Sequence, residues 1–412
     1  MNEWVTAQLG DVVDYFDSKR VPLSGIERAT RQGQYPYYGA SGVIDWIDDY
    51  IFDGRYLLVA EDGENLNSRK LPVAFFADGR FWVNNHAHII RGKPHLLDDV
   101  FLQHWFAHAD ISGYITGAAQ PKLSQANMRR MTIPLPPLPT QRKIGAVLSA
   151  YDDLIENNNR RIKLLEEMAQ RIYREWFVDF RYPGHQSVPL VTTELGPTPD
   201  SWEVRQLSEV ADVVRGRSYR SDDLVESGGV PFVNLKCLRR GGGFRFDGLK
   251  RYQGKHDTEQ EVREGDIVLG VTDLTQEREI LARATLVPCI NEKFGVISLD
   301  VVKIAPHAAE DRLALFFTLS CSDFAQRVRE YANGSTVLHL SPTHVAENKL
   351  LWPPGALRAR FVQNVEPMIT AVNNLAEECK VLSSTRGLLL PRLISGEIDV
   401  ADLDIAMPEE AA

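Results

Sequence analysis

The sequence lacks the features of disulfide-rich, metal-thiolate and membrane proteins. Its four cysteines, Cys237, Cys289, Cys321 and Cys379, are scattered without CxxC spacing, which argues against a disulfide framework and fits a reducing compartment. No stretch approaches the ~18 apolar residues of a membrane span. The first residues carry acids where a signal peptide needs a basic and then an apolar region. We therefore expect a cytoplasmic globular protein.

The patterns of common catalytic sites are also missing. There is no GxSxG or HExxH motif, and the segment 243–250 lacks the Gly-Lys-Ser/Thr step of a phosphate-binding loop. The proline pairs Pro136-Pro137 and Pro353-Pro354 are not flanked by the Asn or Asp and the aromatic residue of an amino-methyltransferase motif. We expect no catalytic residue in this chain.

An excess of basic residues is absent as well. The net charge of −10 argues against nucleic-acid binding, which usually leaves a basic footprint. The charge is unevenly distributed, however. Six acids and no Lys or Arg follow Gly396, whereas nine basic residues and four acids lie between Arg215 and Arg251. A local basic patch therefore remains compatible with the acidic total.

The chain contains an internal repeat. Trp4–Leu9 recurs as Trp202–Leu207, and Gly117–Ile144 parallels Gly334–Phe361, with the second copy about nineteen residues longer in its middle. Two similar segments in the same order indicate a duplication.

Heptad patterns follow the proline-rich segments of both copies. Apolar residues spaced alternately four and three apart predict helices that pack along one seam. Asn158 in the first seam would set the register at some cost in stability. Thr140 would cap the first helix, expected over about 144–176, and Pro367 would kink the second helix or delay its start. The predicted coiled-coil residues are Ile144, Leu148, Tyr151, Ile155, Asn158, Ile162, Leu165, Ile172, Phe361, Val365, Met368, Val372, Leu375, Leu382 and Leu389.

The remaining pattern is mostly strand-like, with short β-branched runs bounded by Gly, Asn and Asp and with helical stretches late in each copy. The predicted fold class is α+β: two mixed α/β domains separated by a long antiparallel two-helix coiled coil, in an internal pseudo-two-fold repeat. The alternative is that each long helix packs on its own domain. The predicted boundaries are a first domain over 1–139, a first helix over 140–181, a linker over 182–201, a second domain over 202–355, a second helix over 356–396 and an acidic C-terminal tail over 397–412.

Polar loops that recur in both copies are candidate DNA contacts. They offer small hydrogen-bonding side chains and cations, the types that bind base edges and phosphates. A second set combines one polar turn with the basic cluster of the second copy. The candidate DNA-binding residues are Asn84, Asn85, His86, Gln120, Lys122, Ser124, Gln125, Arg215, Arg217, Lys236, Arg239, Arg240, Arg245, Thr272, His339, Ser341 and Thr343.

Two other function classes stay open at this point. His86, His88, His104 and His108 have spacings that could bind zinc, as in a metal-dependent hydrolase, although the second copy offers only Lys293 and Gly295 near the first pair. A coiled-coil adaptor without a DNA role would leave the duplicated polar loops unexplained.

Four segments resemble the specificity subunits of type I restriction–modification systems, and the resemblance covers almost the whole chain. They are Ile133–Ile144 running into the heptad helix, Leu390–Ile398 near the end, Tyr38–Gly42 and Phe81–His88. The segment Gly355–Arg360 departs from the family pattern as a weaker version of the junction at Ile133–Ile144.

The resemblance implies a prokaryotic, non-catalytic subunit of an adenine-N6 methyltransferase and restriction endonuclease complex. Each of two target-recognition domains would read one half of a split, asymmetric site in double-stranded DNA. The helices would dock two methyltransferase subunits, and through them restriction and translocase subunits. It further implies that S-adenosylmethionine and ATP with Mg²⁺ bind those partners, and that no cofactor or metal binds this chain.

Overall fold

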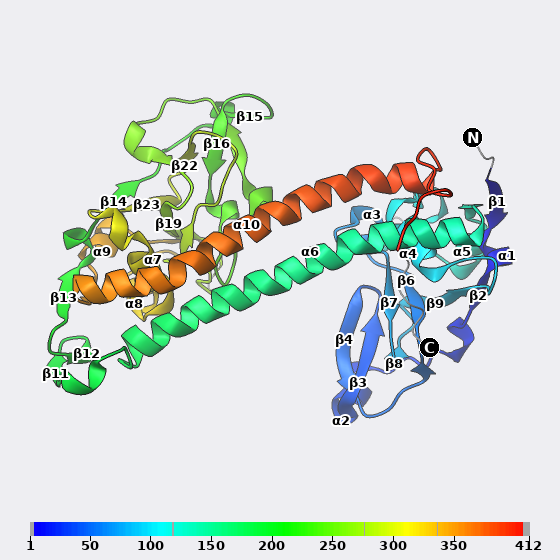
Figure 1. The fold of residues 1–412 in the computed structure, drawn as a ribbon, viewed down its shortest axis with the longest axis horizontal. Coiled ribbons are helices and arrows are strands. Elements are labelled where there is room, and N and C mark those ends of the chain that lie inside the picture. Colours follow the sequence, from blue (N-terminus) through cyan, green and yellow to red (C-terminus); the bar gives the residue numbers. More distant parts are fainter. Residues whose placement is uncertain (1–3, 118, 276, 336, 407–412) are drawn as a thin grey trace. The chain divides into compact units, whose positions relative to one another are not determined.

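The computed structural model describes residues 4–117, 119–275, 277–335 and 337–406. The chain divides into two units, Met1–Asn157 with Glu378–Ala412, and Asn158–Glu377. The two longest helices, α6 (Leu138–Tyr173) and α10 (Gly355–Ile394), each belong partly to unit 1 and partly to unit 2 (Figure 1). Each unit is therefore a mixed helix and strand domain completed by one piece of both helices.

Unit 1 is built on two four-stranded sheets. One has the antiparallel order β2-β9-β6-β7, and the other has the order β4-β3-β8-β5 with β3 and β8 parallel. Strand β6 is buried along Leu57–Ala60, as a short continuous apolar run predicts. Before α6 the elements are β1 (Val5–Gln8), α1 (Leu9–Val12), β2 (Val13–Tyr15), the 3₁₀ helix η1 (Asp17–Lys19), α2 (Gly25–Thr30), β3 (Gln32–Gly39), β4 (Gly42–Ile47), β5 (Phe52–Asp53), β6 (Tyr56–Ala60), α3 (Asn65–Ser68), β7 (Ala74–Ala77), β8 (Arg80–Val83), β9 (Ala87–Gly92), α4 (Asp99–His108), η2 (Ser112–Tyr114), α5 (Gln125–Arg129) and β10 (Thr132–Leu135).

Unit 2 repeats this arrangement. The sheet β14-β23-β19-β21 matches β2-β9-β6-β7, the parallel pair β16 and β22 matches β3 and β8, and the pair β13 and β25 matches β1 and β10. The duplication predicted from the sequence is confirmed. The elements are β11 (Leu190–Thr193), β12 (Gly196–Pro199), β13 (Glu203–Gln206), β14 (Ala211–Arg215), β15 (Leu224–Val225), β16 (Val230–Val233), β17 (Lys250–Tyr252), β18 (Glu261–Val262), β19 (Ile267–Gly270), β20 (Thr272–Asp273), β21 (Ala284–Leu286), β22 (Gly295–Ile297), β23 (Val301–Pro306), α7 (Arg312–Cys321), α8 (Phe324–Arg329), β24 (Leu338–His339), α9 (Pro342–Glu347) and β25 (Lys349–Trp352), with shorter 3₁₀ turns between them.

The long helices pair with each other within each unit. In unit 1 the start of α6, at Ile144 and Leu148, shares a core with the end of α10, at Leu393. In unit 2 the end of α6, at Tyr173, packs with Phe361 near the start of α10. All the predicted seam residues are buried or half-buried. The two helices therefore run antiparallel where they meet, as the heptads predict.

The predicted helix ends need correction. Helix α6 begins at Leu138, so Thr140 lies inside it and does not cap it, and the boundary at 139/140 falls within its first turn. Pro139 is tolerated there because first-turn N–H groups have no helical partner. The helix continues as a π-turn over Arg174–Val178. Pro367 does not delay the start of α10, which begins at Gly355, and Phe361 and Val365 anchor the preceding turns in a core.

The predicted linker is an ordered hairpin. Strands β11 and β12 pair antiparallel across Gly196, and the buried Thr198 hydroxyl donates to the Gly196 carbonyl at 3.1 Å. Tyr182 and Trp202, on either side, are buried in one aromatic cluster with the end of α6. This segment therefore packs on unit 2. Sequence composition alone suggested a linker because hairpin turns and linkers share Gly, Pro and Thr.

Part of the predicted acidic tail is also packed. Val400 is buried in the unit 1 core, and Lys143 donates to the carbonyls of Ala401 at 2.6 Å and Leu403 at 2.9 Å. Apolar residues between the acids explain why the segment folds back. Residues 407–412 of the predicted tail lie outside the described residues. No helix in the described part of the chain is long and apolar enough to cross a membrane.

Candidate nucleic-acid interface

Three loops of unit 1, two of which carry candidate residues, meet at one edge of its sheet. The turn between β8 and β9 holds Asn84–His86, the loop after β6 holds Glu61–Gly63, and the third loop is 117–125. The Glu61 amide donates to the His86 carbonyl at 2.9 Å, and the Leu123 amide donates to the Glu61 carbonyl at 2.8 Å. Backbone hydrogen bonds thus join residues far apart in the sequence into one surface.

The candidate residues of this turn differ in what they can offer to a ligand. Asn84 is buried, and its side-chain oxygen accepts the His86 amide at 2.8 Å, so its hydrogen bonding shapes the turn. Asn85 is exposed at the tip. The half-exposed His86 ring lies 2.7 Å from a carboxylate oxygen of Asp62. Asn85 and His86 are therefore the accessible members.

A buried polar network supports these loops. His88 is almost fully buried, with Nδ1 2.6 Å from a carboxylate oxygen of Asp17 and Nε2 2.7 Å from the Leu123 carbonyl. Since a carbonyl and a carboxylate can only accept, both ring nitrogens donate in this geometry. His88 thus ties strand β9 to η1 and to the loop 117–125.

The network extends to Glu61. Arg20 donates to Glu61 at 2.7 Å, and the Lys122 ammonium lies 3.2 Å from its other oxygen. Burial by itself would raise the pKa values of Asp17 and Glu61. Hydrogen bonds outweigh this effect of burial. His88 and the Ile89 amide donate to Asp17, and Arg20 and Lys122 donate to Glu61. Together with the neighbouring positive charges, these bonds hold both pKa values below their ordinary range.

Sequence reasoning missed most of this network. It singled out Lys122 and His88 but not Asp17, Arg20 or Glu61. These residues lie in different segments, and nothing in their local sequence signals that they meet. The registers of β9 against β6, with His88 opposite Val59, and against β2, with Ile90 opposite Tyr15, bring them together.

Unit 2 builds the same loop assembly with other side chains. The Val271 amide donates to the Asp300 carbonyl at 2.9 Å and the Leu340 amide to the Val271 carbonyl at 2.8 Å, which makes Val271 the counterpart of Glu61. Asp300 and Val302 therefore stand where unit 1 has His86 and His88. The counterparts suggested from the sequence, Lys293 and Gly295, are wrong because the second copy is longer ahead of this turn.

Small residues define the recurring loop. Ser124 and Ser341 each accept an amide hydrogen bond at the start of a short helix, α5 and α9. Gly117 has a φ of +86° and Gly334 a φ of +131°, and an added Cβ would lie 2.3 Å or 1.9 Å from a carbonyl oxygen of its own loop. The exposed candidates Gln120, Lys122, Thr343 and His339, and the half-buried Gln125, lie in or beside these loops.

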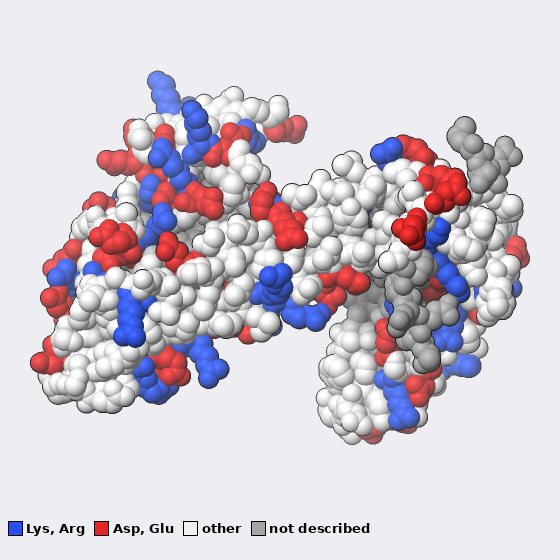
Figure 2. All heavy atoms as spheres, viewed as in Figure 1, with Lys and Arg blue, Asp and Glu red and all other residues white. Residues whose placement is uncertain are grey.

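The basic candidates of unit 2 are partly neutralised by neighbours. Arg245 pairs with Asp247, and the Arg240 guanidinium lies 3.5 Å from Glu279. Lys236 and Arg239 are exposed on the same segment. Figure 2 shows Lys and Arg interleaved with Asp and Glu on the visible face of unit 2, without a uniformly basic stripe.

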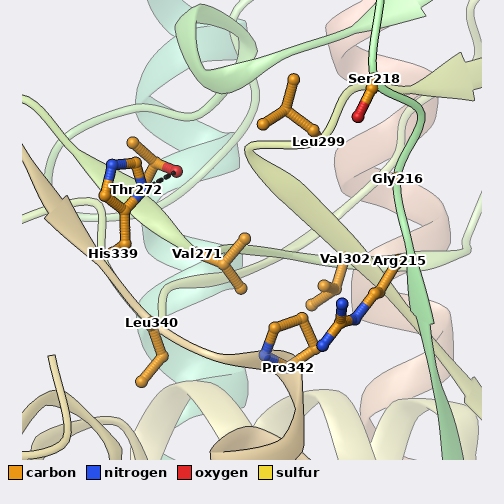
Figure 3. Close-up of a pocket in the computed structure, with 10 residues that line it drawn as sticks. All are labelled: Arg215, Gly216, Ser218, Val271, Thr272, Leu299, Val302, His339, Leu340 and Pro342. Carbon is orange, nitrogen blue, oxygen red and sulfur yellow. Dashed lines mark hydrogen bonds between the residues drawn. The ribbon is translucent and has the colours of Figure 1, made fainter. Parts of the chain in front are cut away.

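Three candidates of unit 2 surround one pocket of about 260 Å³. Arg215 lies on one side of it, and the Thr272 hydroxyl and the His339 ring, 3.4 Å apart, lie on the other (Figure 3). The complete lining is Arg215, Gly216, Ser218, Val271, Thr272, Leu299, Val302, His339, Leu340 and Pro342. Ser218 and Leu299 belong to this site and escaped the sequence reasoning.

The four histidines of the metal hypothesis do not converge. His86 and His88 contact different carboxylates, and His104 lies 3.3 Å from the Ser149 hydroxyl. Burial and the nearby Arg386 lower the pKa of His104 to about 4, so Asp152 at 3.9 Å faces a neutral ring. Within the described ranges no three His, Cys, Asp or Glu residues are arranged to hold a metal ion.

The family model "Type I restriction modification DNA specificity domain" matches residues 1–167 and again 199–356. The chain belongs to this family. It is a type I specificity subunit with two recognition domains, one in each copy of the repeat. The resemblance noted from the proline–helix junction is thereby confirmed.

Curated relatives and solved structures agree with the family. A type I specificity subunit of Methanocaldococcus jannaschii is 26% identical over 71% of this chain and 66% of its own length. A putative type I specificity subunit of Haemophilus influenzae is 33% identical over 37% of this chain and 38% of its own. The chain thus matches less than two thirds of either relative. The crystal structure of an S subunit from M. genitalium has the same fold, with a TM-score of 0.63 and 16% identity over 95% of this chain and 96% of that one.

Proposed function

We propose that the two recognition domains read the two halves of a split, asymmetric DNA site. The observation that carries this proposal is the loop assembly that is built twice with different side chains. Where unit 1 pairs Asp62 with Lys122 across a β-bridge, unit 2 pairs Thr272 with His339. The same backbone frame therefore presents different hydrogen-bonding groups, which is what reading two unlike half-sites requires.

We further propose that α6 and α10 set the distance between the half-sites and dock two methyltransferase subunits. Both helices carry large apolar side chains outside their seam: Leu164 is 53% and Met168 52% exposed on α6, and Val381 is 59% and Leu388 68% exposed on α10. Exposed apolar side chains in rows on a helix are typical of surfaces that bind another protein.

The catalytic steps in this proposal belong to the partners. The methyltransferase subunits would bind S-adenosylmethionine and methylate adenine N6 in the site that this chain selects. Restriction and translocase subunits, with ATP and Mg²⁺, would join through the methyltransferase core. The chain itself would supply recognition and spacing.

The charge of the chain makes a quantitative expectation possible. Phosphate contacts dominate protein–DNA affinity and make it salt-dependent. The net charge is −10, and Arg240 and Arg245 are already paired to carboxylates, which reduces the positive charge available for phosphates. The partners would therefore supply most of the phosphate contacts. The isolated chain should bind DNA weakly, and the complex should bind tightly.

Gel-shift titrations of the chain and of its complex with methyltransferase subunits, over a range of salt concentrations, test this proposal. We expect tight, sequence-selective and strongly salt-dependent binding by the complex only. Equal affinity of the isolated chain, or a complex that shows no sequence preference, would contradict it.

A further inference from the structure

One position of the fold is filled in unit 1 and open in unit 2. Strands β2 and β9 pair Tyr15 with Ile90, and β14 and β23 pair Val213 with Ile304, so these pairs are equivalent. Two residues beyond the first pair, toward the loops, Asp17 meets His88. Two residues beyond the second pair are Arg215 and Val302, which lie opposite each other in the register.

The two copies therefore treat the same space differently. In unit 1 it is occupied by the hydrogen-bonded groups of Asp17, His88 and Glu61, all largely buried. In unit 2 the equivalent residues are Arg215, Val302 and Val271. The two valines leave the middle free of polar side chains, and the result is the pocket of about 260 Å³ in Figure 3.

The Arg215 guanidinium is available at the rim of this pocket. The side chain is exposed, and Figure 3 shows it reaching along the pocket toward Pro342. Among the residues that the structure describes, no carboxylate pairs with it, whereas Arg240 and Arg245 each face one. Arg215 thus retains its planar set of donors for a ligand.

The backbone holds Arg215 in place. The Arg217 amide donates to the Ile297 carbonyl at 2.8 Å, and the Leu299 amide donates to the Arg217 carbonyl at 2.9 Å. Between the two arginines, an added Cβ on Gly216 would lie 1.9 Å from the Ser298 carbonyl oxygen, so only glycine fits this approach. The end of β14, which carries Arg215, is therefore fixed against the turn after β22.

We propose that this pocket is the subsite where unit 2 reads one guanine of its half-site, with Arg215 as the specificity-determining residue. The inference rests on the proposed DNA-reading function. Guanine presents two acceptors, N7 and O6, in the major groove, and the arginine fork matches both. A phosphate contact needs only a cation at the surface. The apolar walls formed by Val271, Leu340 and Pro342 instead suit the edge of a flat base and exclude water from its hydrogen bonds.

Two substitutions separate base reading from phosphate binding. Arg215→Ala removes the fork and the charge, and Arg215→Lys keeps the charge but cannot form the paired hydrogen bonds. For the complex with methyltransferase subunits, sequencing of methylated adenines on a randomised DNA pool gives the site that each variant accepts. Arg220→Ala, which removes an exposed arginine that does not line the pocket, is the matched control.

We expect wild type and Arg220→Ala to require a guanine at one position of one half-site. In both Arg215 variants the preference for guanine at that position should fall at least tenfold, while the base preferences of the other half-site stay unchanged. A half-site without guanine would overturn the inference. Uniformly weaker methylation with Arg215→Ala that Arg215→Lys restores would assign Arg215 to a phosphate and also overturn it, while leaving the proposed function intact. A wild-type complex without any sequence requirement would remove the proposed function itself.

Discussion

His88 shows how one residue supports the accessible loops of the first recognition domain. Its two ring nitrogens join Asp17 and the Leu123 carbonyl, so three chain segments depend on one imidazole. His86, two residues earlier, is half-exposed and has a single carboxylate partner, Asp62. The two histidines look alike in the sequence. Because His88 is buried and His86 is half-exposed, His88 supports the loops and His86 stays accessible to a ligand.

His88→Ala should open this assembly locally. It leaves a buried carboxylate and a buried carbonyl without their donors, which costs about 2 kcal/mol or more. We expect hydrogen exchange of the Leu123 and Ile89 amides to become roughly 30-fold faster, at 1.4 kcal/mol per factor of ten. His86→Ala is the control, because exposed pairs contribute about 0–1 kcal/mol. Unchanged protection in His88→Ala would show that the network does not hold the loops.

The carboxylates of this network predict an acid-sensitive first domain. The folded-state pKa values of Asp17 and Glu61 are lowered from ordinary values of 3.8 and 4.5. The two carboxylates therefore contribute fully to the free energy of unfolding at pH values above 3.8 and 4.5. This contribution is lost as the pH falls from these values through the lower folded-state pKa values. Denaturant unfolding between pH 6 and pH 3 should show this loss. Asp17→Asn should make the free energy of unfolding depend less on pH in this range. An unchanged pH dependence would count against the network.

Single-residue roles were predictable only as regions. The sequence identified the loop 117–125 because polar residues and a glycine recur there in both copies, and the turn at 84–86 because it is polar. It could not show that the Asn84 side chain accepts a hydrogen bond within its own turn, or that Arg20 reaches Glu61. Both contacts depend on burial and on strand register.

At the level of elements, the long helices were the most predictable feature. The heptad period is local, so the residues of the seam follow from spacing alone, and none of those predicted is exposed. The helix ends were less predictable. Pro139 suggested a boundary and Pro367 a kink or a late start. Helix α6 nevertheless begins at Leu138, and packing at Phe361 keeps α10 helical ahead of Pro367.

Two substitutions on α6 should distinguish a buried seam residue from an exposed residue of the same helix. Leu148→Ala empties part of the unit 1 core and should destabilise that unit by about 2–5 kcal/mol. Leu154→Ala, at a 47% exposed position of the same helix, should change stability little. Thermal unfolding of the full chain measures both. Equal destabilisation by the two variants would mean that the seam is misplaced.

At the level of the whole molecule, duplication followed by divergence accounts for two similar domains with different loop residues. The sheets β2-β9-β6-β7 and β14-β23-β19-β21 have the same strand order, whereas the loop residues differ, as in Asp17 and His88 against Arg215 and Val302. The repeat was visible in the sequence through two matching segments. The internal correspondence of His86 with Asp300 was not, because the added residues of the second copy shift the numbering.

The proposed spacer gives the whole molecule a mechanical role. Seven residues added to α6 after Asn157 and seven to α10 before Glu378 preserve the heptad register of both seams. They lengthen the helices by roughly 10 Å at 1.5 Å per residue. At roughly 3.4 Å per base pair, the two half-sites should then move apart by about 3 base pairs while their bases stay the same.

Sequencing of methylated adenines across the genome tests the account most directly, in cells with the gene, without it, and with the paired seven-residue insertion. We predict a split motif that disappears without the gene and that keeps both halves but widens its gap with the insertion. The same methylated sites in all three strains, or a continuous motif that the insertion leaves unchanged, would contradict the account.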